Sequence, residues 1–320
     1  MNKAAVTVLA LALTTGSAIA ADLPSFKAPP PAPLPPPPLW TGFYVGLNAG
    51  GTWSSSNSTR LGSSPLWVSG DNPGPNPSAP ADYSLTAALG ASGVVSSGNS
   101  SGFIGGGQIG YNWQAGFGGY SFVFGVEADI QGIANGGGGN NSSWTNIPAT
   151  GANVLNDSVL TAVSIRKNLD YLGTVRGRLG YLITPTLLVY GTGGLAYGGV
   201  NFNVSGWQAV LPVRASWPSS GFGGGAYSDT RVGWTAGGGL EWMFMPNWSA
   251  KVEYLYYDLG SVQMAAGVTA QFYDGSLGGP PAGLKWLNAT QARANYNGNL
   301  VRAGVNYHFN WGAPPVIAKY

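Results

Sequence analysis

Charged side chains in the middle and last parts of the chain are the groups that could do chemistry. Pairs such as Glu127 and Asp129 stand two residues apart with an apolar residue between them. A carboxylate in such a pair could serve as a general base or as a metal ligand. No His or Cys stands near this pair to complete a metal site, so we expect the acids to pair with arginines. The whole set comprises Glu127, Asp129, Asp170, Arg176, Arg178, Glu241, Lys251, Glu253 and Arg302.

Motifs that would indicate an enzyme are weak. The chain has one histidine, His308, and so one histidine base for a Ser-His-Asp arrangement. Its place on the polar face of a strand predicts a structural hydrogen bond instead. The spacing Gly105-x-Gly107-x-x-Gly110 matches a dinucleotide fingerprint, but residues 111–113 continue a strand where that motif needs a helix. We therefore expect no catalytic residue, no cofactor and no bound metal.

The charged residues belong to strands whose two faces differ in polarity, and the final strand shows this best. One face carries Val301, Ala303, Val305, Tyr307 and Phe309, and the other carries Arg302, Gly304, Asn306 and His308. An apolar face that ends in aromatics, opposite a charged face, is typical of a strand with lipid outside and a polar lumen inside. Arg or Lys facing lipid at mid-membrane would cost ~2–4 kcal/mol, so the charged set is predicted to face the lumen.

Eight segments are predicted as strands, each near the ~9–11 residues that a tilted strand needs to cross a membrane. The segment around 187–190 does not alternate, and its faces stay unassigned. No segment after the first twenty residues is apolar enough to cross as a helix, so an integral protein would have to be a closed barrel. The strands are residues 41–53, 102–115, 121–133, 168–183, 186–202, 230–244, 248–259 and 300–309.

The connections between these strands alternate in length. Three are tight turns, near 116–120, 184–185 and 245–247. The other four are each roughly 25–50 residues long, which a compact soluble domain rarely tolerates. Short periplasmic turns and long extracellular loops are typical of outer-membrane barrels. The apolar stretches 84–95 and 262–273 are predicted to extend hairpins beyond the membrane, or to add a strand pair and give ten strands.

Aromatic residues gather at the short turns, where a girdle at the periplasmic membrane boundary would lie. A soluble core would not place aromatics at every short turn. The predicted girdle comprises Trp40, Phe43, Trp113, Phe117, Tyr120, Tyr181, Trp242, Phe244, Trp248, Tyr307, Phe309 and Trp311.

The ends of the chain and its composition fit an exported barrel. Lys3, the apolar residues 4–13 and the small residues 17–20 predict a signal peptide, residues 1–20, cleaved after Ala20. A proline-rich periplasmic leader, 21–39, precedes the barrel, 40–309, and a tail, 310–320. The absence of cysteine excludes disulfides and thiolate metal sites. A net charge of +2, with 8% charged residues, is too small for a nucleic-acid binder.

Three segments resemble one family of alphaproteobacterial outer-membrane proteins, known as outer-membrane immunogenic, opacity-like or porin-like barrels. They are residues 41–46 after the proline-rich leader, 253–260, and the closing strand 301–309. The resemblance implies an eight-stranded barrel in the bacterial outer membrane, with surface loops and no catalytic residues. The closing strand is also similar to the signal that the barrel-assembly machinery reads, carried here by Arg302, Gly304, Tyr307 and Phe309.

The expected interior decides between functions. Five acids and four bases nearly cancel in a lumen that eight strands make about wide enough for side chains to fill. We therefore expect a structural and surface-interaction barrel with at most limited passive solute passage. The alternatives are a diffusion porin, a receptor for a haem-like small ligand, as some relatives are thought to be, and a lipid-modifying enzyme. Expected partners are outer-membrane lipid, the assembly machinery and an external ligand or host surface at the loops, but no nucleic acid.

Overall fold

The computed structural model describes residues 40–67, 86–97, 101–135, 141–148, 158–211, 219–274 and 282–309. All of them belong to one compact unit, residues 38–320. The predicted signal peptide, leader and tail, with Trp311, lie outside the described residues. Within the described ranges, no helix is both long and apolar enough to span a membrane.

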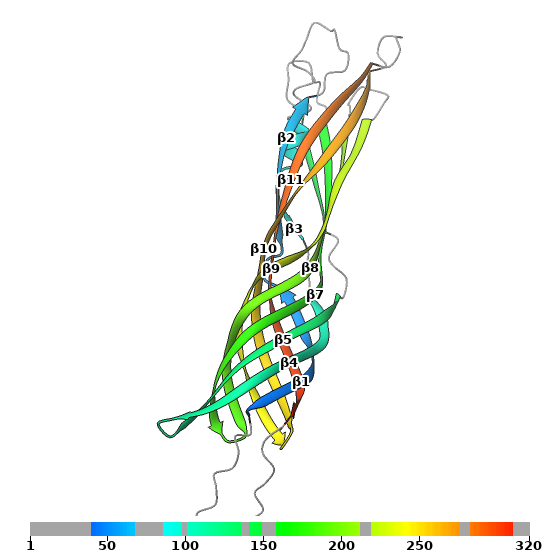
Figure 1. The fold of residues 1–320 in the computed structure, drawn as a ribbon. Helices are drawn as coiled ribbons and strands as arrows, with labels where there is room; N and C mark the ends of the chain where they lie inside the picture. Colours follow the sequence, from blue (N-terminus) through cyan, green and yellow to red (C-terminus); the bar gives the residue numbers. More distant parts are fainter. Residues whose placement is uncertain are drawn as a thin grey trace, which may run out of the picture. The chain divides into compact units, whose positions relative to one another are not determined.

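Eight antiparallel strands of the described chain form a closed ring (Figure 1), which confirms the predicted all-β barrel. The last strand pairs with the first, from Phe43 opposite Phe309 to Ser54 opposite Gly298, so the ring has no free edge. In order around the ring, the strands are β1 (Gly42–Ser54), β4 (Ser101–Phe117), β5 (Tyr120–Asn135), β7 (Ser158–Thr184), β8 (Leu187–Leu211), β9 (Ser219–Met245), β10 (Trp248–Asp274) and β11 (Ala282–Phe309).

The three short connections are two-residue turns, as the spacing predicts. Gly118 and Gly119 join β4 to β5 with φ angles of 60° and 85°. Two positive φ angles in succession define the hairpin turn that glycine adopts without strain. The other turns are residues 185–186 and 246–247. All three lie at the same end of the ring as the start of β1 and the end of β11.

The strands β7 to β11 continue far beyond the ring. They are 25 to 28 residues long, more than twice the ~9–11 needed to cross a membrane. Beyond the ends of β1, β4 and β5, other strands take their places: β2 (Ser58–Trp67) pairs with β11, β3 (Gly93–Ser96) with β2, and β6 (Asn141–Pro148) with β7. We call the eight-stranded ring the proximal tier and this extension the distal tier.

The extension contains the two apolar stretches, 84–95 and 262–273, that the sequence left open between longer hairpins and an added strand pair. Residues 262–273 lie within the long strand β10, as expected of an extended hairpin. The described part of 84–95 is a helical turn at 86–90 and the start of β3. Neither stretch adds a strand pair to the closed ring, which keeps eight strands.

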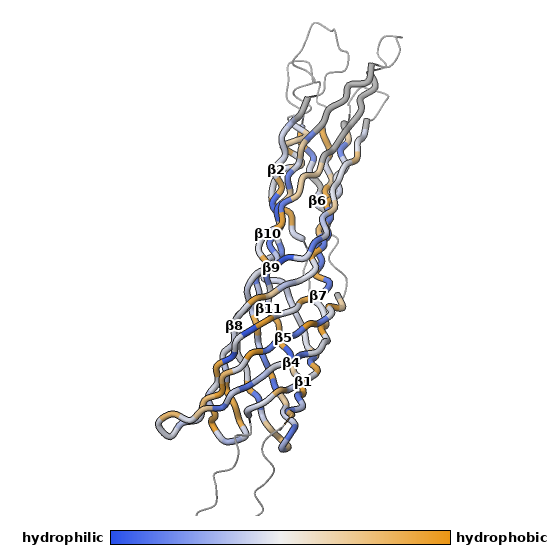
Figure 2. The backbone as a smooth tube through the Cα atoms, in the orientation of Figure 1, coloured by the Kyte–Doolittle hydropathy of each residue, from blue (hydrophilic) through white to orange (hydrophobic). Residues whose placement is uncertain are grey.

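Figure 2 shows that hydrophilic and hydrophobic residues are interspersed along the strands of both tiers. The burial of their side chains shows that the two tiers have opposite polarity. In the proximal tier large apolar side chains face outward, for example Leu47, Ile109 and Val252, which are 74%, 54% and 57% exposed. In the distal tier the apolar side chains face inward and form one buried cluster that includes Ile165, Phe202, Val262 and Met264. Many outward residues of the distal tier are polar, beside the exposed apolar residues Phe222 and Val94. The polar ones include Arg60, Arg166, Asn203, Gln263, Gln291 and Arg293. The proximal tier is therefore built for lipid outside and the distal tier for water outside.

Two β-bulges lie between the tiers. In β7 the pairing with β8 skips Asp170, and in β10 the pairing with β11 shifts between Asp258 and Ser261. Gly260, inside the second bulge, has a φ of 78°. A bulge adds one residue and so exchanges the faces on which odd and even positions lie. In β7, Lys167 and Leu169 point inward on one side of the bulge, and Arg176 points inward on the other.

Lys167 links β7 to β11 and to the segment between β1 and β2 at this level. Its ammonium donates to the carbonyl of Ser56, 2.9 Å away, and to the carbonyl of Asn295. It also lies 4.9 Å from the centre of the Tyr296 ring. Burial lowers the pKa of Lys167 to about 8.

Candidate functional site: the lumen

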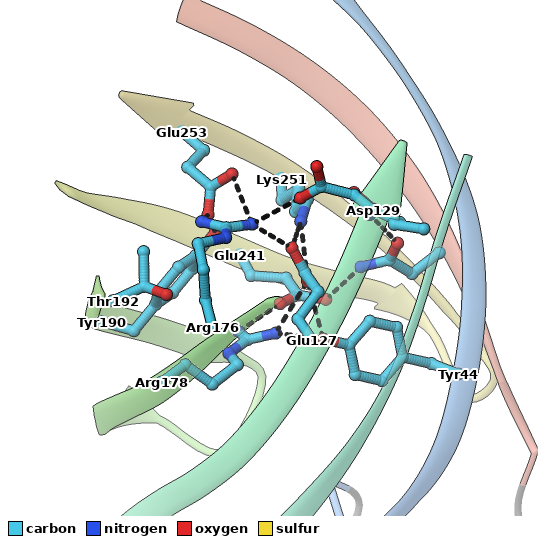
Figure 3. A network of polar contacts seen from close by, with 12 residues as sticks. Tyr44, Glu127, Asp129, Arg176, Arg178, Tyr190, Thr192, Glu241, Lys251 and Glu253 are labelled. Atoms are coloured by element: carbon cyan, nitrogen blue, oxygen red, sulfur yellow. Dashed lines mark hydrogen bonds and ion pairs between the residues drawn. The ribbon is translucent and has the colours of Figure 1, made fainter. Parts of the chain in front are cut away.

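Eight of the nine charged residues predicted to face the lumen do so, and the structure brings them into one network, seven members of which are labelled in Figure 3. Each is at most 5% exposed. Five strands supply them: Glu127 and Asp129 on β5, Arg176 and Arg178 on β7, Glu241 on β9, Lys251 and Glu253 on β10, and Arg302 on β11.

The ninth prediction, Asp170, is wrong. Asp170 is the extra residue of the β7 bulge, and its side chain is exposed on the outer surface. Its carboxylate accepts a hydrogen bond from the amide of Asn201 at 2.5 Å. The sequence prediction extended the inward alternation of Thr174 and Arg176 back through Asp170, but the bulge interrupts it. Without Asp170 the predicted network holds four acids and four bases.

Arg176 is the hub of the network. Its guanidinium pairs with Glu127, with Asp129 at 3.0 Å and with Glu253 at 2.9 Å, and its Nε donates to the Thr174 hydroxyl at 2.9 Å. Arg302 pairs with the same three acids: its strand neighbour Glu253 at 2.6 Å, and Asp129 at 2.8 Å and Glu127 at 3.5 Å on β5 across the lumen. Two arginines thus hold three carboxylates from two strands, β5 and β10.

Glu127 has the most partners among the acids. Lys251 lies 2.9 Å from both of its oxygens, and the hydroxyl of Tyr44 donates to Oε2 at 2.7 Å. Glu127 also stands directly opposite Arg176 in the register of β5 and β7. The pairs Glu253–Arg302 and Lys251–Glu241 are direct cross-strand neighbours as well. Opposite charges in direct register are a stabilising arrangement in a sheet.

Glu241 anchors the part of the network nearest the short turns. It accepts from Arg178 at 2.6 Å, from the hydroxyl of Ser249 at 2.6 Å and from the amide of Asn306 at 2.7 Å. Nε2 of His308 lies 2.9 Å from the Ser249 hydroxyl and 3.5 Å from the Glu241 carboxylate. His308 thus takes part in a lumenal hydrogen bond, as its face predicts.

Apolar layers lie on both sides of the charges. Toward the short turns, Trp40 packs with Val123, Leu182, Leu188 and Met243 in a buried cluster. On the other side lies the apolar core of the distal tier. Trp40 was predicted in the outer aromatic girdle, and this is wrong: its side chain is fully buried, and its indole N–H donates to the carbonyl of Pro185 at 3.0 Å. Its edge meets the His308 ring at 5.8 Å between centroids.

Most other predicted girdle residues do lie on the outer surface near the short turns. Trp113, Phe117, Tyr120 and Trp242 are each at least half exposed. In the closing strand, Tyr307 packs against Trp248 and Phe309, with ring centroids 5.2 and 5.1 Å apart. Of the residues of the predicted assembly signal, Arg302 faces the lumen, Gly304 lies beside β1, and Tyr307 and Phe309 lie at this end of β11. Their reading by the assembly machinery stays a prediction.

Tyr44 is a network member that the sequence analysis missed. It lies inside the barrel and also contacts Arg178, whose Nη1 donates to its hydroxyl at 3.2 Å. The glycine at position 110 of the neighbouring strand β4 is a sign of the inward-facing ring, because a Cβ on Gly110 would lie 2.4 Å from the Tyr44 ring. Glycine at that position leaves the space that the ring occupies.

A closed antiparallel ring with an apolar exterior and a charged, ion-paired interior defines the class of transmembrane β-barrels. The outer membrane protein beta-barrel domain family matches residues 8–309, and the chain belongs to this family of the bacterial outer membrane.

Known relatives agree with this assignment. A 31 kDa outer-membrane immunogenic protein of Brucella melitensis is 32% identical over 302 residues, which are 93% of this chain and 96% of that protein. A 22 kDa outer membrane protein of Rhizobium leguminosarum is 32% identical over 162 residues, 49% of this chain and 53% of that protein. Among solved structures, the outer membrane protein OprG of Pseudomonas aeruginosa matches with 10% identity and a TM-score of 0.32, over 84% of this chain and 97% of that one.

Proposed function

We propose that this protein is a closed outer-membrane barrel with a structural and surface-interaction role and at most limited passive solute passage. The observation that carries the proposal is the sequence of three filled layers along the lumen. An apolar layer around Trp40 is followed by the ion-paired network and then by the apolar core of the distal tier. A hydrophilic solute would have to pass all three.

The charge balance of the lumen supports the same proposal. A selective pore would more often carry a ring of one sign. Here four acids meet four bases at ion-pair distance, and removing one partner of such a buried pair costs ~3–5 kcal/mol. A diffusion porin would need this network to rearrange and both apolar layers to move.

Single-channel conductance in planar bilayers tests the proposal. We expect the wild-type protein to insert without large, stable openings. We also expect liposomes that contain it to swell in a glucose gradient no faster than protein-free liposomes. A Val305→Leu variant, changed only on the lipid-facing surface, should behave in the same way. Large stable openings of the wild type would overturn the closed-barrel proposal in favour of a porin.

We also propose that the barrel is not an enzyme. Ser249, His308 and Glu241 are in contact, but one nitrogen of His308, Nε2, faces both of the others. In a working triad the acid binds the second ring nitrogen and orients the histidine toward serine. All three groups are buried, and the His308 ring lies against Trp40. Release of fatty acids from phospholipid vesicles by the wild type, lost in His308→Ala, would contradict this proposal.

The surface role is proposed for the distal tier. The long strands β7 to β11 run from the membrane-spanning ring into this tier, and many of its outer side chains are polar. The name of the Brucella relative, an outer-membrane immunogenic protein, accords with such display.

A further inference from the structure

Two aromatic residues, Trp207 on β8 and Phe222 on β9, lie on the outer face of the distal tier, and we call them the aromatic pair. They are direct partners in register. Their sequence neighbours Gly206, Gln208 and Gly223 line a cavity inside the tier, so the alternating positions 207 and 222 point outward. Trp207 is half-buried, and Phe222 is 74% exposed, more than any other large apolar residue of the described distal tier.

The aromatic pair is separated from the lipid-facing surface of the ring. The nearest large lipid-facing residue of β9 is Val232, ten residues from Phe222 along the strand. At about 3.3 Å per residue and the usual strand tilt, this spacing is roughly 25 Å in height. The outward positions between them are small or polar: Gly224, Ala226, Ser228 and Thr230. The aromatic pair therefore lies outside the lipid and is not part of an aromatic girdle.

The outward residues next to the aromatic pair on β7, β8 and β9 carry no charge. Ala162 on β7 stands opposite Trp207, on the side away from Phe222. The nearest charged outward residue of β7 is Arg166, four positions from Ala162. Exposed apolar surface of this kind marks an interaction site, and a site without charge favours an uncharged partner. The other outward neighbours are Leu160, Ser205, Ser220 and Gly224.

The size of the surface limits the kind of partner. A stable protein–protein interface takes ~800 Å² and roughly 20–30 residues from each partner, whereas two large side chains among small ones fit a ligand of one or two rings. Direct cross-strand partners have Cβ atoms about 5 Å apart, so the two rings can cover consecutive sugar rings. One face of a neutral sugar ring consists of C–H groups, which pack on an aromatic ring while the hydroxyl groups stay hydrated or bond to neighbours such as Ser205.

We propose that Trp207 and Phe222 bind the sugar rings of a neutral polysaccharide that comes from outside the cell. This proposal deepens the surface role proposed for the distal tier and rests on that role. It does not depend on whether the lumen conducts. The chemistry of the site is stacking of C–H faces on aromatic rings, without ion pairs.

The test measures glycan binding by the full-length protein in phosphatidylcholine nanodiscs. The probes are an array of neutral glucan, mannan and galactan oligosaccharides, beside sulfated and sialylated oligosaccharides. We expect the wild type to prefer neutral oligosaccharides, and Trp207→Ala/Phe222→Ala to bind the best of them about tenfold more weakly or worse. A wild type that binds no neutral oligosaccharide, or that binds the charged ones better, would overturn the proposal.

Single variants separate stacking from general apolar contact. Phe222→Tyr keeps an aromatic ring and should bind as the wild type does. Phe222→Leu keeps an apolar side chain without the ring and should bind at least about threefold more weakly. Val94→Ala, at another exposed apolar residue of the distal tier, is the matched control and should bind as the wild type does. Equal binding by Phe222→Tyr and Phe222→Leu would exclude stacking and overturn the proposal.

Cysteine labelling keeps a failure of this proposal apart from a failure of the proposed surface role. The chain has no cysteine, so Phe222→Cys can be labelled specifically on intact cells with a maleimide that does not cross membranes. We expect this variant to be labelled. Labelling without glycan binding by the wild type would overturn only the glycan assignment. A variant that is not labelled would overturn the surface role as well.

Discussion

Replacing Arg176 by methionine is the sharpest test of the lumenal network. Methionine keeps a long, flexible side chain but removes the guanidinium that holds Glu127, Asp129 and Glu253 together. Lys251 and Arg302 stay beside these acids, so the lumen is left with one carboxylate too many. Because the Arg176 side chain is fully buried, we expect the free energy of unfolding to fall by ~3–5 kcal/mol.

Urea titration of the protein refolded in lipid vesicles measures this loss, with folded and unfolded forms separated by heat-modifiability on a gel. Arg166→Met is the matched control, since it makes the same substitution in the same strand at an exposed position. It should change stability by less than ~0.5 kcal/mol. The double variant Arg176→Met/Glu253→Gln returns the network to three acids and three bases, and it should be more stable than Arg176→Met alone.

Two results would refute the reasoning. Equal effects of Arg176→Met and Arg166→Met would mean that the network contributes nothing measurable. A double variant less stable than Arg176→Met would mean that the excess carboxylate is not the cause of the loss.

Three further predictions concern other parts of the barrel. Val305→Arg, on the lipid-facing surface, should lower the free energy of unfolding of the barrel in vesicles by up to ~2–4 kcal/mol, the cost of an arginine at mid-membrane. Gln291→Arg, on the outer face of the same strand in the distal tier, should fold as the wild type does. Equal yields of the two folded variants would contradict the opposite polarity of the two tiers. The free energy of unfolding of the wild type, relative to that of Lys167→Met, should rise by up to ~3 kcal/mol as pH increases from about 8 toward 10.5. The reason is that the Lys167 ammonium loses its proton at a lower pH in the folded chain than in the unfolded chain. A difference between the two proteins that does not change with pH would show that the pKa of Lys167 is not lowered. Trp40→Ala should cost ~3–5 kcal/mol in urea titration, and an effect near zero would place the ring outside the barrel.

The sequence predicts the ring well because lipid imposes a strict pattern on each spanning strand. The alternation of Glu127 and Asp129, or of Arg176 and Arg178, with apolar residues is enough to assign their faces. It also places Glu253 and Arg302 on the same side of neighbouring strands. Which acid meets which base across the lumen depends on register and tilt, and these are not visible in the order of residues.

The errors arise where the rule of alternation changes. One extra residue at Asp170 reverses the facing of β7, and a single-residue bulge has no distinct sequence signal. Beyond it the chain buries its apolar side, so the same alternation has the opposite meaning. Trp40 is an aromatic residue near the membrane boundary. From the sequence alone, this position is as compatible with the outer girdle as with the buried site inside the barrel that Trp40 occupies.

The pairing of β1 with β11 has a consequence for folding kinetics. The two strands come from opposite ends of the described chain, so the barrel can close only when the last strand is in place. Until then Arg302 cannot reach Asp129, which lies on the far side of that seam on β5. Interactions that form after the rate-limiting step slow unfolding more than they speed folding. The contacts that Arg302 makes across this seam are therefore expected to slow the unfolding of the closed barrel and to have little effect on its folding rate.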